Sequence, residues 1–206
     1  KTADIYAATL RSHSVIVDFE ERVESIRAQI GEIGRTLEAN VVIDEKLLEE
    51  VAALVEWPVV LSGNFDPSFL AVPEEALISA MKEHQRYFHV TDANNKLLPK
   101  FVTVSNIESK DPNAVVKGNE RVIAPRLSDA AFFFSQDKKS DLESMLPRLD
   151  QVIFQSDLGT YKQKVERISS LAGLIAGRLG SNVEAATRAG MLCKSDLVTD
   201  MVNEFP

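Results

Sequence analysis

Residues 119–137 read NERVIAPRLSDAAFFFSQD, a run that places charged groups and aromatic side chains in one helical pattern. Its apolar residues recur at the i, i+3, i+4, i+7 spacing of a buried helix face: Leu127, Ala130, Ala131 and Phe134. Pro125 lacks an N–H that would be unpaired in a first turn anyway, so we expect it to open this helix. Arg126 and Asp129 fall on the neighbouring stripe, where they can support each other as an ion pair.

Two helices are expected on the N-terminal side of this run. The first spans Phe19 to Leu37, has an apolar residue every three or four positions, and is capped by Asp18. The second follows Asp44 and ends before Trp57-Pro58, because a residue that precedes proline avoids helical backbone angles. The preceding residues, 14–17, read as a short strand.

The middle of the chain alternates strands and helices. Residues 59–63, 86–90 and 101–104 have the composition of strands, and residues 73–85 that of a helix. Asn-rich residues 92–96 suit a tight reversal between the last two strands. We therefore predict an α+β fold, with a small and mostly antiparallel sheet, for a domain of residues 1–150.

Beyond residue 151 the pattern becomes helical. One predicted helix has a single apolar face, made of Val165, Ile168, Leu171, Ala172, Ile175 and Leu179. Gly180 can end that helix, and Ser181 or Asn182 can cap the next one. We expect residues 151–206 to be the beginning of an all-helical domain.

Composition and charge limit the function. The 206 residues carry a net charge of −8 and include one cysteine, Cys193, which we expect to be buried and inert. Residues 18–56 hold eleven acidic and four basic side chains, whereas residues 82–126 hold eight basic and five acidic ones. Any contact with RNA is therefore expected in the second stretch, with a merely solvated surface as the alternative.

The chain has no apolar run long enough to cross a bilayer and no leader pattern, so we expect a cytoplasmic protein without membrane association. It lacks an initiator methionine, and we read it as a piece of a longer protein. Phosphate-binding glycine loops, nucleophile elbows and paired metal-binding histidines are also missing. We therefore expect no catalytic residue, no metal and no cofactor in this chain.

Eight polar residues are candidates for contact with RNA. The first four, His84, Gln85, Arg86 and Tyr87, lie where a helix gives way to a strand, and their side chains can stack on bases or bind phosphate. The alternative for this group is structural: Tyr87 and Phe88 alternate between solvent and core as in any strand, and Arg86 pairs with Glu83. The other four, Lys117, Asn119, Arg121 and Arg126, lie further along the basic stretch. The guanidinium group of arginine can bind phosphate through two hydrogen bonds, but it can pair equally well with the carboxylates of Glu120 or Asp129. Internal pairing is the favoured interpretation for Arg121 and Arg126.

Four blocks of sequence resemble one family. They are EHQRYF at 83–88, VSNIESKD at 104–111, the run at 119–137, and KSDLVTDMVNEFP at 194–206. In this order they resemble the beta subunit of bacterial-type glycyl-tRNA synthetase, of which the chain would be an internal fragment. The resemblance implies that residues 161–205 open a domain of the HD phosphohydrolase type, although Asp196 has no imidazole partner here.

The resemblance also implies a function. In that family the alpha subunit forms the adenylate with ATP, and beta supplies tRNA recognition and assembly in a tetramer of two alpha and two beta chains. The expected partners are the alpha subunit and tRNA(Gly), and the fragment alone is expected to be inactive. Hydrolytic editing is disfavoured, because glycine can be selected by size in the first step. The alternative is a non-catalytic protein-interaction scaffold that docks through the helix at 19–37.

Overall fold

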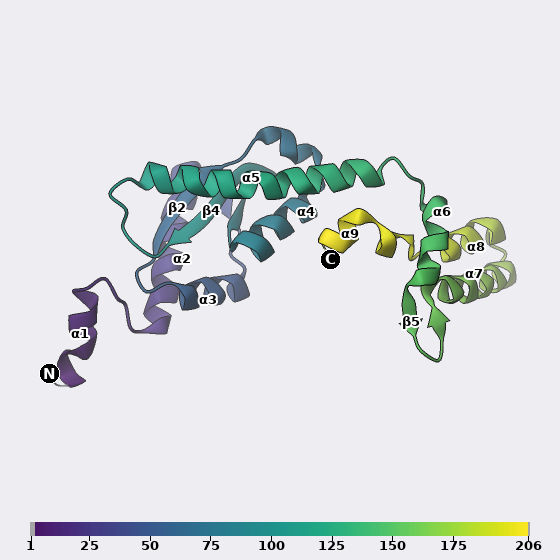
Figure 1. Cartoon of the computed structure of the whole chain (residues 1–206), viewed down its shortest axis with the longest axis horizontal. Helices are drawn as coiled ribbons and strands as arrows, with labels where there is room; N and C mark the ends of the chain where they lie inside the picture. The colour runs from purple at the N-terminus through teal and green to yellow at the C-terminus, as the bar shows by residue number, and fades with distance from the viewer. Residues whose placement is uncertain (1–2, 206) are drawn as a thin grey trace. The chain divides into compact units, whose positions relative to one another are not determined.

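A computed structural model describes residues 3–205, which divide into two compact units, one ending at Ala131 and the other beginning at Phe132 (Figure 1). Unit 1 contains η1 (Ala3–Ile5), α1 (Tyr6–Arg11), α2 (Phe19–Leu37), β1 (Asn40–Val41), α3 (Glu45–Leu54), β2 (Val59–Asn64), η2 (Pro67–Ala71), α4 (Glu74–Ser79), the π-helical turn η3 (Ala80–His84), β3 (Phe88–Thr91), β4 (Leu97–Ser105) and most of α5 (Pro112–Asp137). Unit 2 contains the end of α5, then α6 (Leu142–Met145), η4 (Leu146–Gln151), β5 (Ile153–Gln155), β6 (Gly159–Thr160), α7 (Tyr161–Arg178), α8 (Val183–Leu192), η5 (Ser195–Val198) and α9 (Asp200–Glu204).

Unit 1 is built on a four-stranded antiparallel sheet of order β1-β3-β4-β2. The reversal between β3 and β4 is the predicted one: Asn95 adopts a left-handed φ of 61°, and the Asp92 carboxylate accepts hydrogen bonds from the backbone N–H groups of Asn94 and Lys96. Mixed helices with a small antiparallel sheet confirm the predicted fold class.

Helices α2 and α3 pack on one face of the sheet. Asp18 and Asp44 cap them as predicted, each accepting a hydrogen bond from a backbone N–H three residues on. The apolar stripe of α2 is turned inward, and it joins α3 and the strands in a single core: Val23, Ile26, Ile30, Val41, Leu47, Leu48, Val51, Ala52, Val55, Val60, Phe88, Val90 and Val102. The stripe therefore serves the fold of this unit.

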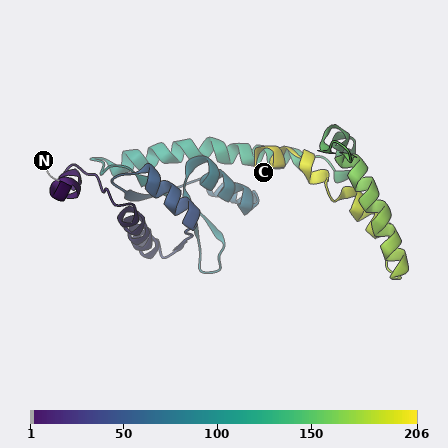
Figure 2. The same cartoon turned by 90° about the horizontal axis from the view of Figure 1, so that it is seen from below.

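Helix α5 runs along the sheet of unit 1 in both views (Figures 1 and 2). The prediction that Pro125 opens a helix is wrong, because Pro125 lies inside a single helix that begins at Pro112. Proline removes the hydrogen bond to the carbonyl of Arg121, but both residues are exposed, so water can solvate that carbonyl. Burial of Ile123, Leu127 and Ala130 on the opposite face holds the helix together on both sides of the proline.

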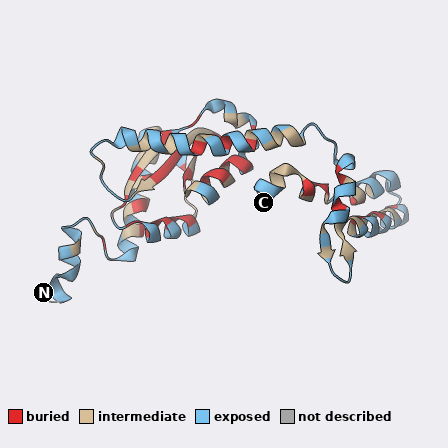
Figure 3. Ribbon diagram, viewed as in Figure 1, coloured by how far each residue is buried: buried red, intermediate tan, exposed pale blue. Residues whose placement is uncertain are grey.

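Unit 2 is mainly helical, with a short β5–β6 hairpin ahead of α7. The predicted inner face of α7 is largely wrong: Val165 is buried, but Leu171, Ile175 and Leu179 are exposed (Figure 3). Small residues face α8 instead. A Cβ at Gly190 would come within 2.7 Å of the backbone of Ser169, and the Ser169 hydroxyl donates to the carbonyl of Thr187 at 2.7 Å. Helices α7 and α8 therefore approach each other closely through small residues, in place of the predicted packing through branched side chains.

Several local predictions have a clear outcome. Asn182 caps α8 and Gly180 follows α7 with a φ of 65°, as expected. The strand predicted at residues 14–17 is not found, although the N–H of Ile16 bonds to the carbonyl of Glu56, and Cys193 is exposed rather than buried. The domain boundary predicted at residue 150 stays a prediction. Within residues 3–205, no helix is both long and apolar enough to span a membrane.

Candidate nucleic-acid interface

The N-terminal third of α5 is fixed to the sheet at two adjacent residues. The phenol of Tyr87, just before β3, donates to Asn119 Oδ1 at 2.6 Å, and Asn119 Nδ2 donates to the Val115 carbonyl at 2.8 Å. At the next position, the Glu120 carboxylate accepts a hydrogen bond of 2.9 Å from the backbone N–H of Asn64, at the end of β2. Helix α5 is thus attached to β2 and to the start of β3 within one peptide unit.

Tyr87 is part of a stack that continues into the sheet. Its ring lies parallel to that of Phe101, with centroids 4.6 Å apart and planes 12° apart. Phe101 pairs with Gly63 of β2, and a Cβ at Gly63 would overlap the Phe101 ring, so the stack requires glycine there. Only 4% of Tyr87 is exposed, and burial raises the pKa of its phenol to about 12.

The cations of α5 lie on the opposite, exposed part of the helix. Lys117 and Arg121 are one turn apart and therefore share one side of it. Arg126 is also exposed, but five residues further on it points roughly 140° around the axis from Arg121. We call the surface of Lys117 and Arg121 the basic face.

The basic face has no internal counterion within the part of the chain that the structure describes. The internal pairing favoured for Arg121 is not found: the Glu120 carboxylate accepts a hydrogen bond from the backbone N–H of Asn64, and adjacent side chains on a helix point about 100° apart. Arg126 does approach Asp129, at 4.0 Å, the limit of an ion pair, with both side chains about half exposed. An ion pair this exposed to water contributes little to the stability of the protein.

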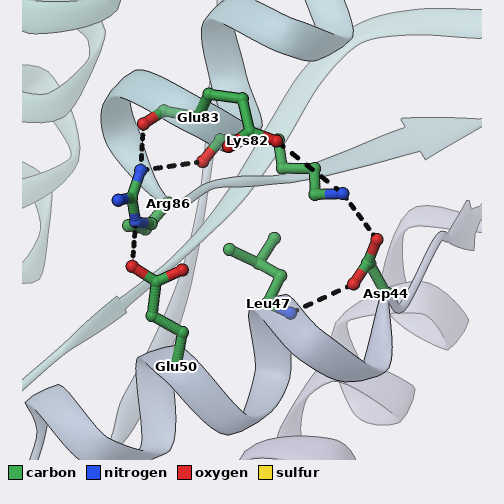
Figure 4. Close-up of polar contacts among 6 residues, drawn as sticks. All are labelled: Asp44, Leu47, Glu50, Lys82, Glu83 and Arg86. Atoms are coloured by element: carbon green, nitrogen blue, oxygen red, sulfur yellow. Dashed lines mark hydrogen bonds and ion pairs between the residues drawn. The ribbon is translucent and has the colours of Figure 1, made fainter.

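The four candidates at the η3–β3 junction are less open. Arg86 has a left-handed φ of 60°, and its guanidinium pairs with Glu50 of α3 and donates to the carbonyls of Lys82 and Glu83 (Figure 4). The guanidinium thereby satisfies carbonyls at the end of η3. His84 is exposed and Gln85 is half-buried.

A second ion pair beside Arg86 strengthens the attachment of η3 to α3. Lys82 Nζ lies 2.6 Å from the carboxylate of Asp44, which also accepts from the N–H of Leu47 (Figure 4). These two hydrogen bonds, that of Lys82 first, lower the pKa of Asp44, and the same contact raises the pKa of Lys82. Arg86 and Lys82 therefore have structural partners, in contrast to the basic face.

The structure thus brings some of the predicted residues together and separates others. Tyr87 and Asn119 are in direct contact, and Asn119 lies between Lys117 and Arg121 in sequence but on the inner side of the helix. The sequence reasoning missed Gly63, Phe101 and Glu50. A glycine inside a strand was the one available signal, since it indicates close approach of another group.

The described residues contain no cluster of three His, Cys, Asp or Glu side chains able to hold a metal ion. Fold and site together define a mixed α/β protein that exposes a small cationic helix surface. The sequence model of the family described as "Glycyl-tRNA synthetase beta subunit" matches residues 1–206. The chain therefore belongs to the glycyl-tRNA synthetase beta subunit family.

Similar proteins carry the corresponding name. The chain is 56% identical over 204 residues to the glycine–tRNA ligase beta subunit of Colwellia psychrerythraea, which covers 99% of this chain. It is 57% identical over 203 residues to that of Pseudoalteromonas translucida and 54% identical over 204 residues to that of Salmonella choleraesuis, each covering 98% of this chain. The chain spans about 30% of the length of these relatives.

Proposed function

We propose that this chain is a part of a glycine–tRNA ligase that supports the ATP-dependent attachment of glycine to its tRNA by contributing to tRNA recognition. In this proposal the alpha subunit holds the adenylate-forming site, the beta chain contributes to assembly of a cytoplasmic tetramer of two alpha and two beta chains, and the present piece has no activity of its own. Membership of the beta subunit family supports the proposal.

The basic face of α5 is the observation that supports a role in tRNA binding. Lys117 and Arg121 are like charges at i and i+4, a spacing at which they repel each other and destabilise a helix by roughly 0.2–0.5 kcal/mol. Neither has a carboxylate partner among residues 3–205, in a chain whose net charge is −8. An arrangement that is unfavourable for the fold is favourable for a phosphate backbone.

The proposal is tested by reversing these charges in the full-length beta subunit assembled with alpha. Lys117→Glu with Arg121→Glu should raise the KM for tRNA at least tenfold and leave the KM for glycine and ATP unchanged. Lys46→Glu, on the exposed surface of α3, is the matched charge control and should change nothing. An unchanged KM for tRNA in the double variant would remove the tRNA role from this face.

The isolated chain provides a second check. Mixed with glycine and ATP it should show no pyrophosphate exchange, and robust exchange would contradict the assignment of chemistry to alpha. The scaffold alternative loses its main support, because Val23, Ile26 and Ile30 of α2 are buried in the core of unit 1. Binding that is indifferent to tRNA identity in a gel-shift titration at two salt concentrations would revive that alternative.

A further inference from the structure

We infer that Tyr87 is a positioning residue for tRNA binding: it holds Asn119 so that Lys117 and Arg121 face solvent in a fixed orientation. The inference rests on the proposed function of the basic face. It also changes the role expected for Tyr87 and Asn119, because a phenol that is 4% exposed and bonded inside the protein is not available to stack on a base.

The geometry explains how one hydroxyl can set the orientation of a helix. Asn119 has its two amide atoms fixed at once, Oδ1 by Tyr87 and Nδ2 by the Val115 carbonyl one turn earlier. The amide therefore cannot rotate without losing a hydrogen bond. Since Asn119 lies between the two cations, any rotation of α5 that moves Asn119 away from Tyr87 also moves the basic face.

The residues beneath Tyr87 are buried and closely packed. Phe101 is fully buried, stacks on Tyr87, and is in turn held by its pairing with Gly63, next to the last pair of the β2–β4 ladder. The Glu120 carboxylate, bonded to the N–H of Asn64, adds a second attachment one residue away. Preorganised cations bind a phosphate backbone better than mobile ones, because less freedom is lost on binding.

Tyr87→Phe tests the inference, because it removes only the hydroxyl and keeps the stacked ring. In the full-length enzyme it should raise the KM for tRNA about three- to tenfold, the effect of one hydrogen bond, and leave kcat unchanged. Asn119→Ala removes the acceptor from the helix side and should have the same effect. Tyr161→Phe, in which a half-buried tyrosine of unit 2 loses its hydroxyl, is the matched control and should have none.

A double-mutant cycle separates positioning from a general loss of stability. In a background of Lys117→Ala with Arg121→Ala, Tyr87→Phe should no longer change the KM for tRNA, because there is nothing left to position. A variant that merely folds less well would lower kcat in both backgrounds. An unchanged KM in Tyr87→Phe, or an equal rise in both backgrounds, would overturn the inference.

The same data distinguish failure of the inference from failure of the proposed function. If Lys117→Ala with Arg121→Ala leaves the KM for tRNA unchanged, the tRNA role of the basic face is wrong and the inference falls with it. If that double variant raises the KM and Tyr87→Phe does not, the tRNA role stands and the inference alone is wrong.

Discussion

At Tyr87 a single hydroxyl joins a strand to a helix inside the protein. The phenol is nearly inaccessible, its ring stacks on Phe101, and its proton is directed to Asn119. Burial disfavours the phenolate, so the pKa rises to about 12. Ionisation of this group is thereby coupled to unfolding.

The raised pKa of Tyr87 predicts how the stability of the protein changes with pH. Between pH 10 and pH 12 the unfolded chain releases the Tyr87 proton and the folded chain retains it, so stability falls as the pH rises. Across this range the protein should lose about 2 kcal/mol more than Tyr87→Phe does. Urea denaturation of both proteins at pH 9 and pH 11.5 measures the difference. Parallel losses in the two proteins would show that Tyr87 titrates normally.

At the scale of the element, α3 depends on its N-cap residue, Asp44. Asp44 accepts from the N–H of Leu47 and pairs with Lys82 of η3, so one carboxylate caps the helix and attaches it to its neighbour. Asp44→Ala should destabilise the protein by roughly 1–2 kcal/mol at pH 7, mostly through loss of the cap, since the ion pair is more than a third exposed.

The stability lost in Asp44→Ala should also depend on pH. Because the folded state lowers the pKa of Asp44, the stabilisation is complete above the ordinary value of 3.8 and disappears as the pH falls through the lowered pKa. Thermal unfolding should therefore show wild type and Asp44→Ala converging in acid. Asp18→Ala, which removes a cap without an ion pair, is the matched control. A constant difference between wild type and Asp44→Ala down to low pH would contradict this account.

Helix α5 contains the clearest conflict between local preference and observed structure. Pro125 interrupts the backbone hydrogen bonds of a 26-residue helix at an exposed position. Pro125→Ala restores an N–H for the Arg121 carbonyl and should raise stability by roughly 1–3 kcal/mol, measured by urea denaturation. Ser128→Ala, also exposed on α5, should change stability by no more than about 0.5 kcal/mol. A destabilised Pro125→Ala would mean that the proline ring is needed where it lies.

The elements that could be predicted are those whose signals are local. Caps at Asp18 and Asp44, the asparagine reversal before β4 and the end of α7 at Gly180 depend on neighbouring residues alone. The position of Pro125 inside α5 could not be predicted, because the burial of Ile123, Leu127 and Ala130 on both sides of it depends on the tertiary structure. The face of α7 was misread because glycine and serine let α8 approach more closely than the branched residues would.

The candidate site likewise has features that local sequence signals could predict and features that depend on the tertiary structure. The basic stretch and both residues of the Tyr87–Asn119 pair could be identified from the sequence, because the residue types alone indicate polar contact. It could not show that one side of α5 is internal and the other exposed, since that depends on the position of Phe101 and Gly63 across the sheet. It also could not show that Arg86 is neutralised by Glu50, thirty-six residues away.

For the whole molecule, a net charge of −8 has to be reconciled with binding to a polyanion. The two are compatible if the contact is limited to a few cations on one helix, while the acidic side chains of residues 18–56 lie largely on α2 and α3. Such a contact is weak alone and is reinforced when other parts of a longer chain bind the same tRNA.

The salt dependence of tRNA binding tests this central claim most directly. In the full-length beta subunit, replacing Lys117 and Arg121 with alanine should reduce the slope of log K against log salt by about 2, one for each lost phosphate contact. Arg126→Ala, on the other side of α5, should reduce it by less than 1. A slope that is the same in wild type and in the double variant would contradict the claim that the basic face of α5 contacts tRNA.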